Sequence, residues 1–180
     1  MICIFDGNLV LYKSDTRFLS WLHARDTYSK EKIKHLQRKE LTRINGSAWL
    51  SGFIDAEGCF NSTKIKDERY TLKFRVRLRF ILDQKGEKKI FYNVQDFLQS
   101  GVISNRAQVD CMYRFTSTSI YSHKILIKYL QSYSLRTTKR YKCLRFCDLL
   151  GCIESIKESP WEGQVLLRVE SLLRDSSLRS

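Results

Sequence analysis

The sequence is poor in proline, glycine and long apolar runs. One proline and eight glycines in 180 residues exclude a collagen-like or low-complexity chain. No apolar run approaches the roughly 20 residues that cross a bilayer, and the first residues show no basic segment of a secretory signal. With 43% hydrophobic residues, the chain is expected to be a folded domain without a membrane partner.

The cysteines lack the spacing of a zinc site, which usually takes two ligands from one turn of the chain. Cys143 and Cys147 lie four residues apart in a helical stretch and could bring two thiolates together. The favoured prediction is that the cysteines are reduced and buried as small hydrophobic residues, which indicates a reducing intracellular compartment. The six are Cys3, Cys59, Cys111, Cys143, Cys147 and Cys152.

Acidic residues are scarce relative to basic ones. The 32 Lys and Arg outnumber the 19 Asp and Glu, giving a formal net charge of +13 and an isoelectric point of about 9.6. The excess is concentrated, because residues 61–80 carry seven basic and two acidic side chains. A polyanion is the expected partner, and nucleic acid is favoured over an anionic membrane surface.

The hydrophobic periodicity predicts two parts. Residues 1–46 are expected to hold a helix at 16–24 and a basic linker, and residues 47–180 the main domain with its C-terminal helices. From residue 48 the patterns predict a helix (48–57), two strands (59–66, 70–82), a helix (87–98), two strands (101–104, 109–116) and three helices (121–133, 140–157, 162–174). This order predicts an α+β fold with helices on one face of a four-stranded antiparallel sheet.

The second strand alternates between apolar and basic residues. Its basic side chains would recur about every 6.6 to 6.8 Å along one face, and a β-ribbon fits the DNA major groove. We therefore predict a nucleic-acid-binding surface here, with an ordinary solvated sheet face as the alternative. The candidate nucleic-acid-binding residues are Lys64, Lys66, Lys73, Arg75, Arg77, Arg79, Lys85, Arg106 and Arg114.

A nine-residue motif, Leu-Ser-Gly-Phe-Ile-Asp-Ala-Glu-Gly, occupies residues 50–58. Its small residues allow two helix backbones to approach closely. The acid at the helix C-terminus, Glu57, opposes the helix dipole, which suggests a metal partner. The motif resembles the signature of the LAGLIDADG homing endonucleases, and the resemblance continues through Asp83-Gln84-Lys85 to about Lys157.

This resemblance implies an αββαββα fold whose saddle-shaped sheet lies in the DNA major groove. It implies that Glu57 binds Mg²⁺ or another divalent cation, that Gln84 helps position water or the metal shell, and that Asp55 is structural. The family's basic catalytic residue falls on Thr138 in an ungapped comparison, and a shift of one residue restores it as Lys139. The interface helix that would pack against a second domain contains Leu50, Ser51, Gly52, Ile54, Asp55 and Ala56.

The chain contains one motif, whereas the family's catalytic unit needs two. Its N-terminal segment resembles the link between the two domains of double-motif proteins from mitochondrial introns. We therefore expect the C-terminal half of such a protein, in a mitochondrion or a plastid. Its partner would be a second copy, a separately encoded first half or a different macromolecule.

Two functions agree with the motif and the basic strand. The favoured one is a divalent-metal-dependent DNA homing endonuclease that acts on double-stranded DNA. The alternative is a catalytically weak or inactive relative that binds structured RNA, as an intron maturase or as a protein recruited to an organellar ribosome. A third interpretation is a chance match of the motif in an unrelated α+β module that does not bind nucleic acid.

Overall fold

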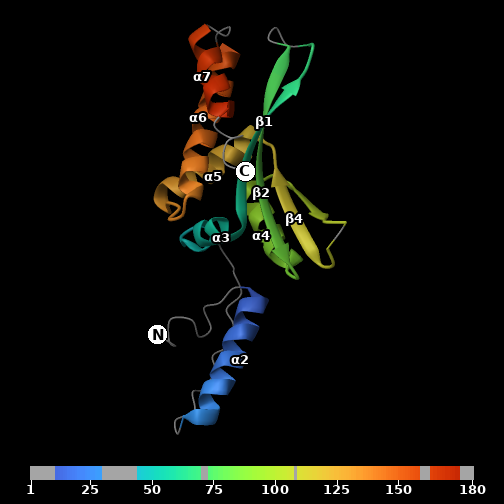
Figure 1. Cartoon of the computed structure of the whole chain (residues 1–180), viewed down its shortest axis with the longest axis vertical. Helices are drawn as coiled ribbons and strands as arrows, with labels where there is room; N and C mark the ends of the chain where they lie inside the picture. Colours follow the sequence, from blue (N-terminus) through green and yellow to red (C-terminus); the bar gives the residue numbers. More distant parts are fainter. Residues whose placement is uncertain (1–10, 30–43, 70–72, 108, 159–162, 175–180) are drawn as a thin grey trace.

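The computed structural model describes residues 11–29, 44–69, 73–107, 109–158 and 163–174 (Figure 1). The element order predicted from residue 48 onward is confirmed. The elements are α2 (Tyr12–Tyr28), α3 (Trp49–Glu57), β1 (Gly58–Lys66), β2 (Phe74–Lys85), α4 (Lys88–Leu98), β3 (Val102–Asn105), β4 (Met112–Ser117), α5 (Ile120–Ser132), α6 (Lys139–Glu158) and α7 (Gly163–Arg174).

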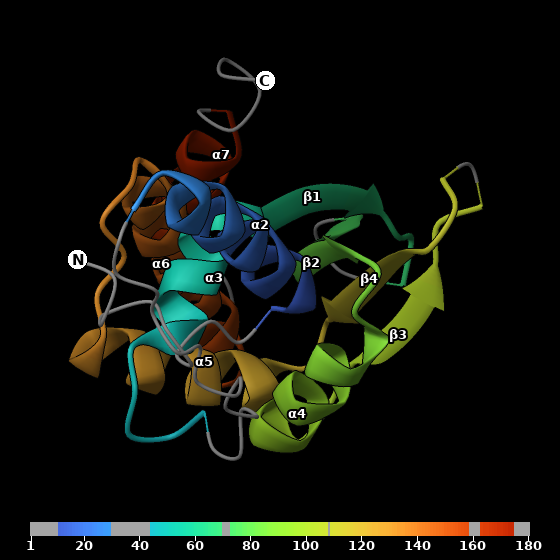
Figure 2. The same ribbon diagram turned by 90° about the horizontal axis from the view of Figure 1, so that it is seen from below.

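The strands form one antiparallel sheet in the order β1-β2-β4-β3. Strand β2 is central because it pairs with β1 from Phe74 to Leu82 and with β4 from Phe80 to Lys85. Helices α3, α5 and α6 gather on one side of the sheet (Figure 2). The predicted α+β fold with helices on one face is therefore confirmed.

The core lies between this helical layer and the even-numbered side chains of β2. Phe80 and Leu82 are fully buried, and they share the core with Phe115 of β4, Ile54 of α3 and Phe91 of α4. Burying each such side chain contributes about 1.5–3 kcal/mol. Because successive strand residues point to opposite faces, the odd-numbered side chains of β2 face away from the helices.

One glycine is required by a close approach in the core. Gly101, between α4 and β3, has φ of +127°, and a Cβ there would lie 2.3 Å from Cε2 of the Phe115 ring. Any other residue would have to displace that ring. The glycine therefore sets the entry of the second strand pair into the sheet.

The cysteines of the described ranges are all free thiols, as predicted. Cys143 and Cys152 are buried, but Cys59 and Cys111 are exposed, so the prediction of burial is wrong for those two. Cys3 lies outside the described residues. None of the described helices is long and apolar enough to span a membrane.

The N-terminal helix is longer than predicted. Helix α2 extends below the sheet and its helices, away from the rest of the domain (Figure 1). Most of the predicted basic linker, residues 30–43, lies outside the described residues. Strand β2 begins at Phe74 rather than at residue 70, and Lys73 just before it has φ of +58°, which is not a strand conformation.

Candidate active site and nucleic-acid interface

The motif helix passes into the sheet without a loop. Glu57 is the last residue of α3, and Gly58 is the first residue of β1. A Cβ at position 58 would lie 2.7 Å from both Cγ2 and the carbonyl oxygen of Ile54, so only glycine lets the strand leave the helix here. The Glu57 side chain is exposed at this junction.

Helix α3 and the connection between α5 and α6 hold each other through reciprocal polar contacts. The Asp55 carboxylate accepts hydrogen bonds from the backbone N–H groups of Arg136 and Thr137, at 2.7 and 3.2 Å, and from Thr137 Oγ1 at 2.6 Å. In return, Lys139 Nζ donates to the carbonyl oxygens of Ile54 and Ala56, at 3.2 and 2.8 Å. We call these contacts the α3–α6 clasp.

The clasp brings favourable contacts to the charged groups of both Asp55 on α3 and Lys139 on α6. Partial burial favours the protonated form of Asp55, but the hydrogen bonds from Thr137 and Arg136 outweigh it and hold the pKa of Asp55 below its usual value. The Lys139 ammonium group bonds two carbonyls at the negative end of the α3 dipole, where a cation is favoured. The clasp therefore holds the Lys139 ammonium group at the carbonyl oxygen of Ala56, the residue that precedes Glu57.

Gln84 belongs to the same end of the sheet. The register pairs Gly58 with Leu82, so Gln84 lies two residues beyond the strand position that faces the end of α3. The Gln84 side chain is buried and shares its face of β2 with Phe80 and Leu82. Glu57, Gln84 and Lys139 thus come from chain segments that meet where α3 joins the sheet.

A divalent cation would find one suitable carboxylate here. Within the described ranges, no three Asp, Glu, His or Cys side chains form a metal-binding cluster. Mg²⁺ is usually bound by one or two protein carboxylates, with water and phosphate oxygens as its other ligands. The exposed Glu57 carboxylate fits this pattern, provided that a nucleic acid and a second domain supply the remaining ligands.

The outward face of β2 carries Arg75, Arg77 and Arg79. The Asn61 side-chain oxygen, opposite on β1, accepts hydrogen bonds from Nε and Nη2 of Arg79 at 3.1 and 2.9 Å. Arg75 Nε lies 3.4 Å from the Asp67 carboxylate. Arg77 is exposed, and its side chain forms no hydrogen bond or ion pair with any residue in the described part of the chain.

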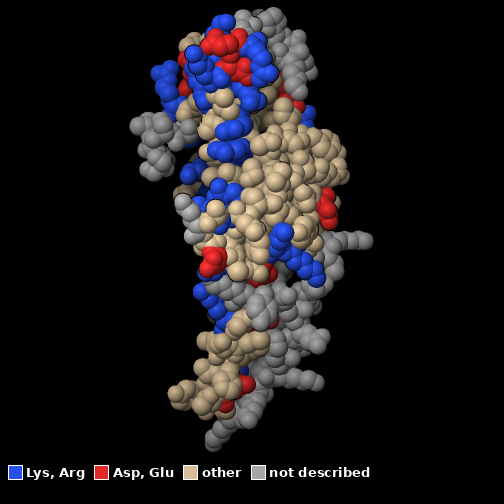
Figure 3. Space-filling view, turned by 90° about the vertical axis from the view of Figure 1, so that its right-hand side faces the viewer, with Lys and Arg blue, Asp and Glu red and all other residues tan. Residues whose placement is uncertain are grey.

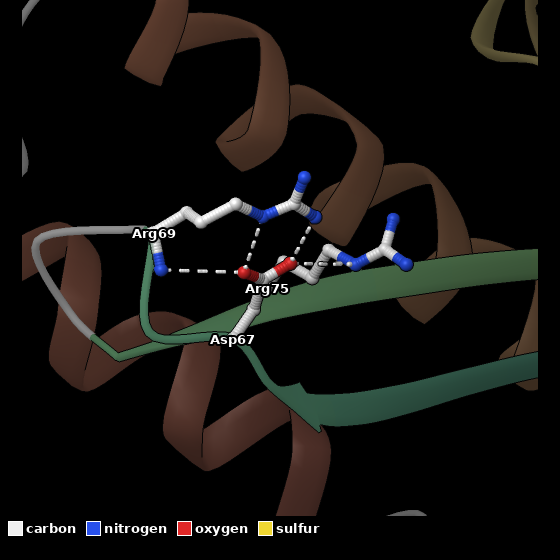
Figure 4. A network of polar contacts seen from close by, with 3 residues as sticks. All are labelled: Asp67, Arg69 and Arg75. Carbon is white, nitrogen blue, oxygen red and sulfur yellow. Dashed lines mark hydrogen bonds and ion pairs between the residues drawn. The ribbon is translucent and has the colours of Figure 1, made fainter.

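Asp67 joins two arginines at the end of the β1–β2 hairpin (Figure 4). Its carboxylate accepts hydrogen bonds from the backbone N–H and from Nε and Nη2 of Arg69, at 3.3, 2.9 and 2.9 Å, and lies beside Arg75. The Arg69 hydrogen bond is the main cause of the lowered pKa of Asp67. Basic side chains gather around a few acidic ones in the upper part of Figure 3, where this hairpin lies in Figure 1.

A second carboxylate that contacts arginines lies on the same face, further along β2. Asp83 faces Arg114 of β4, whose Nε and Nη2 lie 2.7 and 2.6 Å from the two carboxylate oxygens. Arg106 Nη1 lies 3.4 Å from the same carboxylate. The hydrogen bond from Arg114 lowers the pKa of Asp83, and the pKa of Arg114 is raised in turn. The sequence patterns did not predict Asn61 or Asp83 as partners of these arginines. For Asp83 a signal was available, because an acid at an outward position of a basic strand indicates pairing with a neighbouring arginine.

Three candidate basic residues lie elsewhere. Lys66 pairs with the core residue Phe74 in the register, so it faces the helical layer. Lys64 shares that face, with Nζ 3.2 Å from Glu170 of α7 and 3.9 Å from the Phe74 ring centroid. Lys73 precedes the strand. We leave these three out of the nucleic-acid surface, whereas Lys85 is exposed on the outward face.

The predicted interface helix divides into two faces. Leu50, Ser51 and Ile54 are buried in the domain's own core, so they are not available to a second domain. Gly52 and Ala56 are exposed, and a Cβ at position 52 would meet no atom of the described residues within 4 Å. This exposed face adjoins a groove of about 420 Å³ whose other wall includes the end of α5 and the connection to α6.

Comparison with protein families agrees with the motif and the fold. The model of the family described as LAGLIDADG endonuclease matches residues 50–150, which is more than half of the chain. The chain belongs to the LAGLIDADG endonuclease family. Its LAGLIDADG helix is α3, which runs directly into β1 and is held near its C-terminal end by the α3–α6 clasp.

Two curated relatives match different shares of the chain. "Probable intron-encoded endonuclease 4" of Neurospora crassa is 32% identical over 169 residues, which are 93% of this chain and 30% of that protein. "DNA endonuclease I-CvuI" of Chlorella vulgaris is 37% identical over 60 residues, which are 33% of this chain and 37% of that protein. The chain therefore spans about a third of the length of these curated relatives.

Solved LAGLIDADG structures share the fold. The homing endonuclease I-CvuI, in complex with the I-CreI target DNA, superposes with a TM-score of 0.60 at 27% identity, covering 74% of this chain and 80% of that one. The meganuclease I-SmaMI bound to DNA gives a TM-score of 0.64 at 19% identity, over 79% of this chain and 46% of that one. The second likeness concerns the fold alone.

Proposed function

We propose that this chain is half of a site-specific homing endonuclease that hydrolyses double-stranded DNA with a divalent metal ion. The observation that carries the proposal is the junction of α3 and β1, where the exposed Glu57 adjoins a sheet whose outward face is basic. A sheet of this kind suits the major groove and brings the acid to the DNA backbone. The names of the relatives, an intron-encoded endonuclease and a DNA endonuclease, support the same function.

Three side chains are assigned to the chemistry. Glu57 would hold Mg²⁺, which stabilises negative charge on the phosphate. Gln84 would position water or the metal shell from the neighbouring strand. Lys139 bonds two carbonyls of α3, and its remaining N–H is available to a phosphate oxygen beside Glu57.

A second LAGLIDADG domain would complete the site. One domain supplies one motif acid, and Mg²⁺-dependent cleavage of both strands needs a second. Gly52 and Ala56 lie on the exposed face of α3, and the described residues give no packing reason for glycine at position 52. We assign that face to the second domain, which is either another copy of this chain or a separately encoded half.

An organellar intron is the proposed origin of the chain. Two further relatives are described as proteins in ND4 intron 1 of Podospora anserina and in cox1 intron 2 of Schizosaccharomyces pombe. These names support a mitochondrial location. The RNA-binding alternative is less favoured, because the named relatives with a stated activity are endonucleases and the solved neighbours cited above bind DNA.

Cleavage of plasmids tests this function. A plasmid library would carry the fused exon junctions of the genome that encodes the chain, and would be incubated with the full chain and Mg²⁺. We expect linear products that disappear with a chelator and with Glu57→Gln, but persist with Glu154→Gln, which removes an acid of α6 paired with Lys124. Tight RNA binding without DNA cleavage by any of these proteins would contradict the proposal.

A further inference from the structure

The cluster of Asp83, Arg114 and Arg106 contains an acid on a surface proposed to meet DNA. A carboxylate there repels phosphates, so it lowers general affinity for nucleic acid. Its position is nevertheless built into the sheet, because the register of β2 and β4 sets Asp83 directly opposite Arg114. General attraction of DNA does not account for such an acid.

The contact between Asp83 and Arg114 uses only one edge of the guanidinium group. Nε and Nη2 are bonded to the carboxylate, at 2.7 and 2.6 Å. A guanidinium carries five N–H donors, so the edge formed by Nη1 and Nη2 keeps three of them. Guanine presents two acceptors, O6 and N7, on its major-groove edge, and paired N–H donors match them.

The carboxylate also orients the arginine. Two parallel short hydrogen bonds fix the plane of the guanidinium, so less side-chain freedom is lost when it meets a base. The pair remains ionised at neutral pH, because the pKa of Asp83 is lowered and that of Arg114 is raised. Arg106 differs, since only its Nη1 approaches Asp83, at 3.4 Å, and its side chain is more exposed, at 47% against 33%.

We propose that Asp83 holds Arg114 as the reader of one guanine in the DNA target, so that this pair determines sequence specificity. The inference rests on the proposed function, namely that the outward sheet face lies in the major groove. Arg106 then serves as a phosphate contact that adds affinity without sequence preference. A purely structural role of the ion pair predicts a different result, a loss of stability without any change in the preferred sequence.

Selection from randomised double-stranded DNA tests the proposal without knowledge of the natural target. The full chain, Arg114→Lys, Asp83→Asn and the matched control Arg106→Lys would each be selected with Ca²⁺ present, and thermal unfolding would confirm that each is folded. We expect the unmodified chain to require guanine at one position. Arg114→Lys should lower that preference roughly 5- to 150-fold, the range for losing a bidentate base contact.

The other two variants separate orientation from charge. Asp83→Asn should lower the same guanine preference while keeping or raising general affinity, because it removes a negative charge. Arg106→Lys should leave the preference unchanged. Variants of Arg114 and Asp83 that select the same sequence as the unmodified chain would overturn this inference alone, whereas failure of the unmodified chain to select any DNA would overturn the proposed function as well.

Discussion

The ammonium group of Lys139 lies 2.8 Å from the carbonyl oxygen of Ala56, one residue before the exposed acid of the LAGLIDADG motif. Lys139, which matches the family's basic residue only after a shift of one position, is therefore held against the end of α3. Thr138, the ungapped match, is exposed. This contact supports the proposal that Lys139, rather than Thr138, is the cation beside Glu57.

Replacing Lys139 should affect cleavage far more than folding. Lys139→Gln removes the cation beside Glu57, and loss of one such stabilising group typically costs about 100- to 1,000-fold in rate. Its contribution at the end of α3 is only about 0.3–1 kcal/mol. Single-turnover cleavage and thermal unfolding measure the two effects, with Lys142→Gln, an exposed neighbour on α6, as the control. Equal cleavage by Lys139→Gln and Lys142→Gln would contradict the assignment.

Breaking the other half of the clasp should lower stability. Asp55→Asn weakens the acceptor for Thr137 and Arg136, and we expect a loss of about 1 kcal/mol because the site is only partly buried. The pKa of Asp55 is lowered in the folded state. Its stabilisation is therefore present above the unfolded pKa of about 3.9 and is lost as the pH falls through the folded pKa. Chemical denaturation between pH 2.5 and 6 should show a smaller acid dependence for Asp55→Asn than for the unmodified chain.

Two glycines of the motif should respond oppositely to substitution. A Cβ at position 52 would meet no atom of the described residues within 4 Å, and leucine is a better helix former than glycine, so Gly52→Leu should stabilise the domain by about 0.5–1 kcal/mol. It should nevertheless abolish assembly with the second domain, measured by sedimentation or by co-purification. Gly58→Ala should lose about 1–3 kcal/mol by overpacking against Ile54. Normal assembly of Gly52→Leu would refute the interface.

The outward arginines should set the salt dependence of DNA binding. Arg77→Ala should lower affinity for all sequences and reduce the slope of log affinity against log salt by about 0.9, because the Arg77 side chain is exposed and has no partner among the described residues. Arg75→Ala should have a smaller effect, since Arg75 is shared with Asp67. Lys64→Ala removes the same charge from the opposite face and should leave the slope unchanged. A smaller salt-dependence slope for Lys64→Ala would contradict the assignment of the DNA contacts to the outward face of the sheet.

His123 should make the domain less stable in mild acid. Its ring is fully buried, with Nε2 3.1 Å from the carbonyl oxygen of Ser117 and the ring of Phe146 beside it. Burial lowers its pKa, so below the unfolded value of about 6.5 the unfolded chain binds more protons and stability falls. Melting temperatures at pH 7.5 and 5.5 should differ less for His123→Gln, whereas exposed His23→Gln should behave like the unmodified chain.

Local patterns predicted the elements that short-range rules determine. The alternation of β2 identified Arg75, Arg77 and Arg79 as one face, and the motif placed the end of α3 at Glu57. The face of Lys64 could not be predicted in this way, because β1 shows no clear alternation and its orientation depends on pairing with β2. The contact of Asp83 with Arg114 joins residues 31 apart, and it too depends on strand register.

The direct passage from Glu57 to Gly58 limits how the domain can change during evolution. Insertion of one residue at this junction would turn every side chain of β1 to the opposite face of the sheet. Substitution of an outward strand residue alters one contact and leaves the acid where it is. Under the proposed function, a lineage whose DNA target drifts could therefore vary its outward strand residues, while the distance from those residues to Glu57 would stay fixed.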